Sequence, residues 1–255
     1  MKYLALCIMC KNDEAALIEN IKYHTLIGVD HFIIYDNLST RPLSQALSNM
    51  SNVTVHVWSD TQRGRQVRCY NDCINRYANT FRWVGFIDTD EFIVPKNGVK
   101  SVKDFLKDYE NYGGLGINWR CFGSSGYTKK QTSIIESYIY AAGSGDDVHI
   151  KSIVNPKAVE ISAINLHGFK YKPGFFCVNE LKQKIETHHL NTPVSRKLIQ
   201  INHYVTRSRE EYEEKRKRGD GNVLGGAKLT EQFWSRFQGG QVDTSIKDFI
   251  KLIKG

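Results

Sequence analysis

The sequence has no apolar run approaching the roughly 18 residues that a membrane-spanning helix needs. Residues 1–14 contain only a short apolar stretch and no small-residue cleavage site, so we expect no secretory leader. Internal repeats and low-complexity linkers are also missing. These absences predict a cytoplasmic protein of one domain, because 255 residues can bury a substantial core.

Cysteine is too sparse for a disulfide scaffold, and the scatter of the six cysteines suits a reducing compartment. Cys7 and Cys10 form a C-x-x-C, but residues three apart in a strand-like run face opposite sides, which disfavours a zinc or redox site. Acidic residues are outnumbered: 27 Asp and Glu stand against 35 Lys and Arg, a net charge of +8. This charge predicts an anionic partner, which could be nucleic acid, a membrane surface or a phosphorylated small molecule.

Apolar, strand-like runs alternate with helical patterns in the first part of the chain. The runs cover residues 3–10, 31–37, 53–58 and 83–88, and the helical patterns cover 12–28 and 65–78. Asn12 or Asp13 should cap the first helix and Gly28 should end it. This alternation predicts an α/β fold with a doubly wound parallel sheet, which binds ligands at the carboxyl ends of its strands. Three runs end in polar residues that would meet at such an edge: Lys11-Asn12, Asp36-Asn37 and Asp88-Thr89-Asp90.

After residue 95 the pattern is less regular, with short strand-like pieces and a late strand ending at His203. The last helix is amphipathic, with Ile246, Phe249, Ile250 and Ile253 on one face and Lys247, Lys251 and Lys254 opposite them. We expect this helix to pack on the core, with peripheral membrane contact as the alternative. We interpret residues 1–255 as one domain with a nucleotide-binding half (1–95), an acceptor and catalytic half (96–219) and a helical tail (220–255).

The run WVGFIDTDEFIVP, residues 83–95, places Asp88, Asp90 and Glu91 directly after a buried strand. Carboxylates near a core are costly unless a positive group faces them. In an extended segment Asp88 and Asp90 would project to the same side, where a D-x-D pair suits a divalent cation that also binds phosphate oxygens. The alternative is a strand end whose acids pair with a nearby lysine or arginine, such as Lys96.

Five blocks of the sequence, in one order from about residue 10 to 219, together resemble glycosyltransferase family 92 and related family-2-like enzymes of the GT-A fold. The blocks are KNDEAALIENIKYHTLIGVDHFIIYDNLS, WVGFIDTDEFIVP, NWRCFGSSG, KSIVNP and NHYVTRSREEYEEKRKRG. The resemblance implies a Rossmann-like, mostly parallel sheet flanked by helices, with an irregular acceptor-side half. It also implies a glycosyltransferase that uses Mn2+ or Mg2+ and a nucleotide-sugar donor, usually a UDP-sugar.

On the donor side, the resemblance implies that Asp36 holds the nucleobase or ribose and that Lys11 and Asn12 line the nucleotide pocket. The alternative for Lys11 is a solvated loop residue. Arg65 and Gln66 open the second helix, where they could face the diphosphate, because helix N-termini favour anions.

On the metal side, the resemblance implies that Asp90 is the main metal ligand and that Asp88 approaches the ribose or the metal. His203 would complete the metal shell, with His167 in reserve; the alternative for His203 is a structural hydrogen bond. Trp119 would form an apolar platform for a sugar face, and the alternative is a core position.

If the reaction inverts the anomeric carbon, as the resemblance implies, a carboxylate must accept the proton of the attacking hydroxyl. Glu136 is the preferred candidate because it follows the acceptor-side turn in a strand-like stretch. Asp146 and Asp147, among glycines, are the others. A retaining reaction would need no such base.

Two other function classes share some of these features. A metal-dependent nucleotidyltransferase would also use acids at a strand end, but the segment CIMCKNDE lacks the glycines of a phosphate-binding loop. A basic module for nucleic acid or a membrane surface should expose aromatic residues among its basic ones, whereas here they lie within apolar runs. We therefore expect a glycan or lipid-linked acceptor and no nucleic acid.

Overall fold

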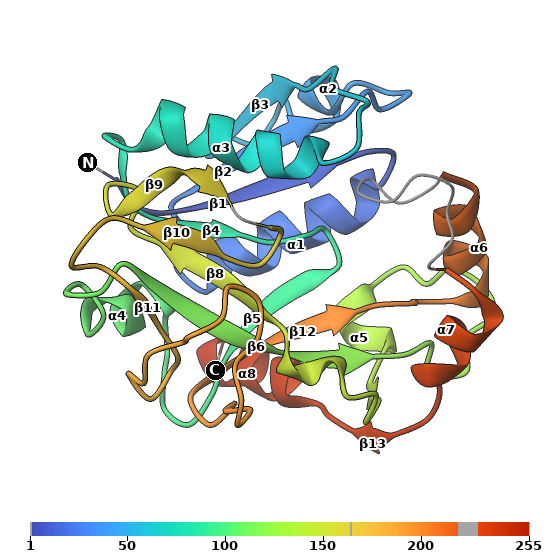
Figure 1. The fold of residues 1–255 in the computed structure, drawn as a ribbon. Coiled ribbons are helices and arrows are strands. Elements are labelled where there is room, and N and C mark those ends of the chain that lie inside the picture. Colours follow the sequence, from blue (N-terminus) through green and yellow to red (C-terminus); the bar gives the residue numbers. More distant parts are fainter. Residues whose placement is uncertain (1, 164, 219–228, 255) are drawn as a thin grey trace.

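A computed structural model describes residues 2–163, 165–218 and 229–254, which form an α/β fold (Figure 1). The first part of the chain builds four strands in the order β4-β1-β2-β3, all paired in parallel. These strands are β1 (Lys2–Cys10), β2 (His31–Asp36), β3 (Val53–Val57) and β4 (Phe81–Phe86). The connections contain α1 (Glu14–Leu26), α2 (Leu43–Ala46) and α3 (Arg65–Tyr77).

The second part extends the same sheet beyond β4, so that it has eleven strands among the described residues. β8 (Ile150–Val154) lies antiparallel between β4 and β6 (Gly114–Phe122). β12 (Ile199–Tyr204) then pairs in parallel with β6 and antiparallel with β5 (Glu91–Pro95). The same sheet therefore contains strands from before and after residue 95. The division into two halves and a tail stays an interpretation. Residues 220–228 of the expected tail lie outside the described residues.

Shorter elements complete the fold. The helices are α4 (Val102–Lys107), α5 (Ile134–Ser137), a 3-10 turn (Asp146–Val148), α6 (Arg209–Arg218), α7 (Glu231–Arg236) and α8 (Ser245–Lys254). The strands are β7 (Tyr140–Ala141), β9 (Val159–Ala163), β10 (Phe169–Tyr171), β11 (Cys177–Val178) and β13 (Gln241–Val242). Among the described helices, none has the length and hydrophobicity required to span a bilayer.

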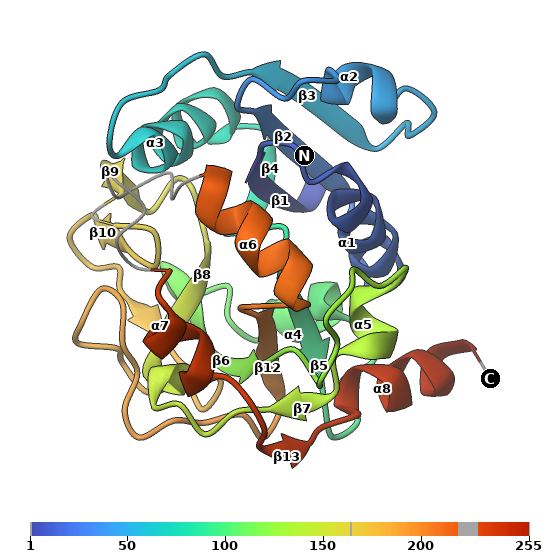
Figure 2. The ribbon, with the colours of Figure 1, turned by 90° about the vertical axis from the view of Figure 1, so that its right-hand side faces the viewer.

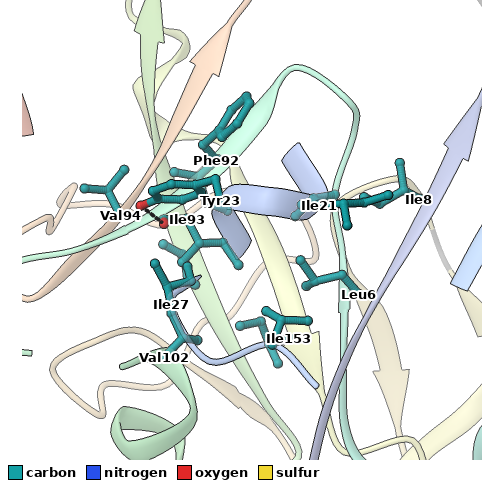
Figure 3. Close-up of a cluster of buried hydrophobic side chains, with 14 of the residues drawn as sticks. Leu6, Ile8, Ile21, Tyr23, Ile27, Phe92, Ile93, Val94, Val102 and Ile153 are labelled. Atoms are coloured by element: carbon teal, nitrogen blue, oxygen red, sulfur yellow. Dashed lines mark hydrogen bonds between the residues drawn. The ribbon is translucent and has the colours of Figure 1, made fainter. Parts of the chain in front are cut away.

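The two faces of the parallel strands bury different clusters because successive side chains of a strand point to opposite sides. Leu6 packs with α1 on one face, whereas Cys7 packs with α3 on the other (Figure 1). Cys10 belongs to the α1 face, so the expected separation of Cys7 and Cys10 is confirmed. In the α1 cluster, the Tyr23 hydroxyl donates a 2.8 Å hydrogen bond to the Ile93 carbonyl, which ties α1 to β5 (Figure 3).

The ends of α1 and the packing of α8 show which local predictions hold. Gly28, with a φ of 100°, follows the end of α1 as predicted. Asp13, one of the two predicted cap residues, stands at the N-cap position, but its side chain makes no capping hydrogen bond to the helix. The expected core packing of α8 is confirmed, because Ile246 and Phe249 are buried in the main cluster. The side chains of Ile253 and Lys254 lie outside the described ones, and membrane contact stays a prediction.

Candidate active site

The predicted site lies at the carboxyl edge of the parallel strands, where α6 crosses in front of the sheet (Figure 2). A cleft of about 570 Å3 opens between the start of α1 and the segment after β2, lined among others by Asn12, Thr40 and Lys130. A second space of about 30 Å3 shares Asn12 and Lys130 and is walled by α6, including Lys215. The two spaces therefore lie on either side of shared wall residues, one toward the segment after β2 and one toward α6.

Asp88 and Asp90 lie in the turn between β4 and β5, and Glu91 begins β5, which corrects the reasoning from strand alternation. β4 ends at Phe86, and the Glu91 amide donates to the Asp88 carbonyl at 3.1 Å. The Glu91 carboxylate in return accepts from the Asp88 amide at 2.8 Å. This tight turn brings Asp88 and Asp90 to the sheet edge, but it directs them to different partners.

Asp88 is held by Lys151, which the sequence analysis did not identify. Lys151 lies on β8 with its side chain 1% exposed, and its ammonium is 2.9 Å from Asp88 Oδ2 and 3.5 Å from Glu91 Oε2. Gln66 donates to Asp88 Oδ1 at 2.5 Å. Burial alone would raise the pKa of Asp88, but the charge of Lys151 outweighs it and lowers this pKa. Burial also raises the pKa of Glu91 to about 8, with Lys151 only partly opposing it.

Asp90 is held by a second lysine, Lys215 of α6, at 3.0 Å from Oδ2. The other side of the carboxylate faces His203, whose Nε2 is 3.8 Å from Oδ1. Burial would raise the pKa of Asp90, but the attraction of Lys215, followed by that of His203, holds it well below its usual range. The alternative in which lysines pair with the acids is thus the arrangement observed, although Lys96 instead binds Gln200.

His203 is positioned by the insertion of β12 between β5 and β6, which places it opposite Glu91 on one side and Cys121 on the other. Its ring centroid lies 4.2 Å from that of Trp119. Burial lowers the pKa of His203 to about 4, and Asp90 only partly opposes this. Among the described residues, His203 Nδ1 and Trp119 Nε1 are buried polar atoms without a hydrogen-bond partner. Both atoms could serve a bound polar group.

Trp119 also contacts the reserve candidate His167, with ring centroids 5.1 Å apart. The Nδ1 atom of His167 lies 2.8 Å from the Ile150 carbonyl. Burial, followed by the charge of Lys151, lowers the pKa of His167 to about 3, so the ring stays neutral at pH 7.

Of the donor-side candidates, Asn12 lines the cleft, and Asp36 holds in place two residues that line it, Ser39 and Leu43. Asp36 is buried, and its two carboxylate oxygens accept the amides of Ser39 and Leu43 at 2.9 Å each. Asn12 accepts the Thr40 amide at 2.7 Å. Lys11 lies in the loop between β1 and α1 beside Asn12. In this geometry Asp36 shapes the segment after β2, and its predicted contact with a nucleobase or ribose stays a prediction.

Arg65 and Gln66 begin α3, as predicted. The structure brings Gln66 to Asp88, but the Arg65 guanidinium binds the carbonyl of Thr61 at 3.3 Å. Arg65 Nε is a buried polar atom without a partner among the described residues. A phosphate group would satisfy it, because guanidinium donors match phosphate oxygens.

None of the three candidates for the catalytic base is brought to the acids by a described contact. Asp146 accepts a hydrogen bond from the Arg236 guanidinium at 2.6 Å. Asp147 accepts hydrogen bonds from the Cys121 amide at 2.9 Å and from the guanidiniums of Arg196 and Arg120. Glu136 lies on α5 with its side chain 60% exposed, 3.4 Å from the ammonium of Lys247. These assignments stay predictions, and a proton transfer to Asp147 would have to displace a guanidinium.

The family model described as Glycosyltransferase family 92 matches residues 2–222. The chain belongs to glycosyltransferase family 92. The predicted GT-A fold, an α/β domain whose curled sheet is flanked by helices, is thereby confirmed. Within residues 2–163, 165–218 and 229–254 of this family 92 chain, no three His, Cys, Asp or Glu side chains are gathered closely enough to hold a metal ion.

Plant members of the family are similar to this chain. A glycosyltransferase family 92 protein of Oryza sativa subsp. japonica is 31% identical over 221 residues, covering 83% of this chain and 35% of the relative. One of Ricinus communis is 29% identical over 221 residues, covering 83% and 37%. The family 92 chain therefore spans about a third of the length of these curated relatives.

Solved structures resemble the family 92 chain more loosely. TarS of S. aureus covers 94% of this chain with a TM-score of 0.47 and 15% identity, and 44% of TarS is matched. Glucosyl-3-phosphoglycerate synthase from Mycobacterium tuberculosis, in a complex with Mn2+ and UDP-glucose, covers 47% of this chain with a TM-score of 0.34 and 17% identity. The match spans 44% of the synthase.

Proposed function

We propose that the chain is a metal-dependent glycosyltransferase that moves a sugar from a nucleoside-diphosphate donor to a hydroxyl of a glycan or lipid-linked acceptor. Membership of family 92 supports the transferase class. The geometry adds an acidic turn and a buried histidine at the carboxyl edge of the parallel strands, and Lys215, which binds Asp90, lines the small space beside α6. This arrangement at a strand edge is the observation that carries the proposal.

The residues at the acidic turn fit a divalent cation, with Asp90 and His203 as the protein ligands. In an octahedral shell with ligands about 2.1 Å from the ion, neighbouring ligands lie roughly 3 Å apart and opposite ligands roughly 4.2 Å apart. The distance of 3.8 Å between Asp90 Oδ1 and His203 Nε2 lies between these values and is too long for a hydrogen bond, so the two side chains would shift by less than about 1 Å to share an ion. A cation that also binds donor phosphates needs only one or two protein carboxylates. Asp88, held by Lys151 and Gln66, would then line the site at its edge.

Each group has a defined task in this proposal. A bound Mn2+ or Mg2+ would supply a positive charge that stabilises the departing diphosphate. Lys11, Asn12 and Asp36 would hold the nucleotide in the cleft. Arg65 would bind a phosphate through its unpaired Nε.

The acceptor side has the weaker set of assignments. The indole of Trp119, beside His203, would support one face of the transferred sugar. An inverting reaction would use Glu136 or Asp147 as the base, and we retain both as candidates. A UDP-sugar is the first donor to test, because the family resemblance implies a UDP-sugar as the usual donor.

A thermal-shift panel of nucleoside diphosphates, with and without Mn2+, tests the proposal. We expect one nucleotide to raise the melting temperature only when Mn2+ is present, because ligands that bind the folded state stabilise it. The shift should vanish in Asp90→Ala and persist in Asp104→Ala, a matched loss of an exposed carboxylate on α4. A chain indifferent to every nucleotide, with or without Mn2+, would contradict the proposal.

A further inference from the structure

Lys215 shares the Asp90 carboxylate with the proposed cation site. Its ammonium lies 3.0 Å from Asp90 Oδ2 and 3.4 Å from the Val205 carbonyl oxygen, whereas the cation would bind at Oδ1, which faces His203. An ammonium and a metal ion bound to the same carboxylate would repel each other at short range. Lys215 and a cation at Asp90 therefore compete for the charge of one carboxylate.

The two lysines at the acidic turn differ in how freely they can leave it. Lys151 projects from the middle of β8, and its side chain is 1% exposed between Asp88 and Glu91. Lys215 projects from α6 with its side chain 34% exposed, so water can solvate the ammonium once it is released. Lys151 is thus a fixed countercharge, whereas Lys215 is free to exchange.

The start of α6 is firmly held, which confines the exchange to the Lys215 side chain and the helix end. Arg207, two residues before the start of α6, makes two hydrogen bonds to Asp13, of 3.0 and 2.5 Å, with its side chain 8% exposed. Glu211 in the first turn accepts from the Tyr138 hydroxyl at 2.7 Å. These contacts fix α6 against the strand edge, with Lys215 one turn beyond Glu211.

Charge balance also favours exchange. Asp88 and Asp90 carry two negative charges, which Lys151 and Lys215 neutralise. Adding a divalent cation while Lys215 stays in place would leave two uncompensated positive charges beside one another. Release of Lys215 halves that excess before any donor phosphate arrives.

We propose that Lys215 is a positioning residue, a tethered cation that holds Asp90 until a divalent cation displaces it. The idea rests on the proposed function, since it presupposes a metal at Asp90. It makes metal affinity weaker in the empty chain than the ligands alone would allow. Metal binding is then favoured when donor phosphates supply the remaining ligands.

Mn2+ titration without nucleotide tests this directly, followed by calorimetry or by the electron paramagnetic resonance signal of free Mn2+. Lys215→Gln keeps most of the side-chain length but removes the charge, and we expect its Kd for Mn2+ to fall about fivefold, the scale of one partly exposed ion pair. Lys217→Gln, on an exposed position of the same helix, should bind Mn2+ like the wild type. An unchanged Kd in Lys215→Gln would overturn the proposal.

A stability measurement separates metal competition from a structural role. In EDTA, Lys215→Gln should unfold at a lower temperature than the wild type because it has lost an ion pair, and saturating Mn2+ should abolish the difference. A deficit that persists in Mn2+ would refute displacement. If wild type and Lys215→Gln both fail to bind Mn2+ even with the nucleoside diphosphates of the thermal-shift panel present, the metal site itself is absent and the proposed function fails with it. Mn2+ binding that is lost in Asp90→Ala but unchanged in Lys215→Gln would refute only the role of Lys215.

Discussion

Replacing Lys151 with methionine tests the reasoning about the acidic turn without any ligand. The substitution keeps most of the side-chain volume but leaves Asp88 and Glu91 without the ammonium that lies between them. Removing one partner of a buried ion pair costs about 3 to 5 kcal/mol. Because the Asp88 side chain is 32% exposed and water can partly replace the lysine, we expect the lower end, about 3 kcal/mol.

Urea unfolding at pH 7, followed by circular dichroism, measures this loss as a shift in the midpoint. Lys170→Met is the matched control, because Lys170 pairs with Glu160 at 2.7 Å but their side chains are 60% and 36% exposed. We expect this variant to lose less than about 1 kcal/mol of unfolding free energy. The double variant Lys151→Met/Asp88→Asn should have an unfolding free energy about 1 to 3 kcal/mol higher than Lys151→Met alone, which is the coupling typical of contacting groups. If the unfolding free energy of Lys151→Met lies within about 1 kcal/mol of the wild-type value, the role of Lys151 as a buried countercharge is refuted.

Two further predictions concern the scaffold around the site. His24 is buried and its Nε2 accepts the Ile93 amide at 3.1 Å, and burial lowers its pKa to about 3. Below pH 6.5 the unfolded chain therefore binds the extra proton, so the contribution of His24 to stability should fall by about 1.4 kcal/mol per pH unit between pH 6 and 4. Urea unfolding at several pH values measures the slope of the unfolding free energy against pH. This slope should be smaller by the equivalent of one proton in His24→Gln but unchanged in the exposed His188→Gln. Equal slopes for wild type and His24→Gln would contradict the prediction. Gly123→Ala would place a Cβ 1.7 Å from the Phe237 carbonyl oxygen, which should cost about 1 to 3 kcal/mol in thermal unfolding. At Gly143 an added Cβ meets nothing within 4 Å, so the unfolding free energy of Gly143→Ala should stay within about 0.5 kcal/mol of the wild-type value. Equal losses of stability in the two alanine variants would disprove the steric argument.

Much of the fold was predictable because apolar runs of strand length are separated by helical patterns. The runs at 31–37 and 53–58 match β2 and β3 to within one residue at each end. The polar residues that follow β1, β2 and β4 do meet at one edge, since parallel strands end on the same side. Local periodicity was sufficient where burial alone decides the structure.

The partners of the acidic residues were beyond such reasoning because they depend on distant contacts. Lys215 and Asp90 are 125 residues apart, and no local pattern links them. Lys151 left one usable signal: it is the single charged residue in the strand at 150–154, and a buried charge needs a countercharge. The alternation argument for Asp88 and Asp90 failed because the hydrogen bond from Glu91 to Asp88 closes a turn that apolar patterning does not reveal.

The late insertion of β12 has a consequence for how the protein is made. β5 emerges from the ribosome long before its neighbour, since Lys96 and Gln200 at the far end of this pair are 104 residues apart. Until then the segment after the acidic turn is an unpaired edge, which invites association with other chains. Such distant pairing also slows folding. Newly synthesised chains should therefore be most vulnerable to aggregation in the interval before residues 199–204 appear.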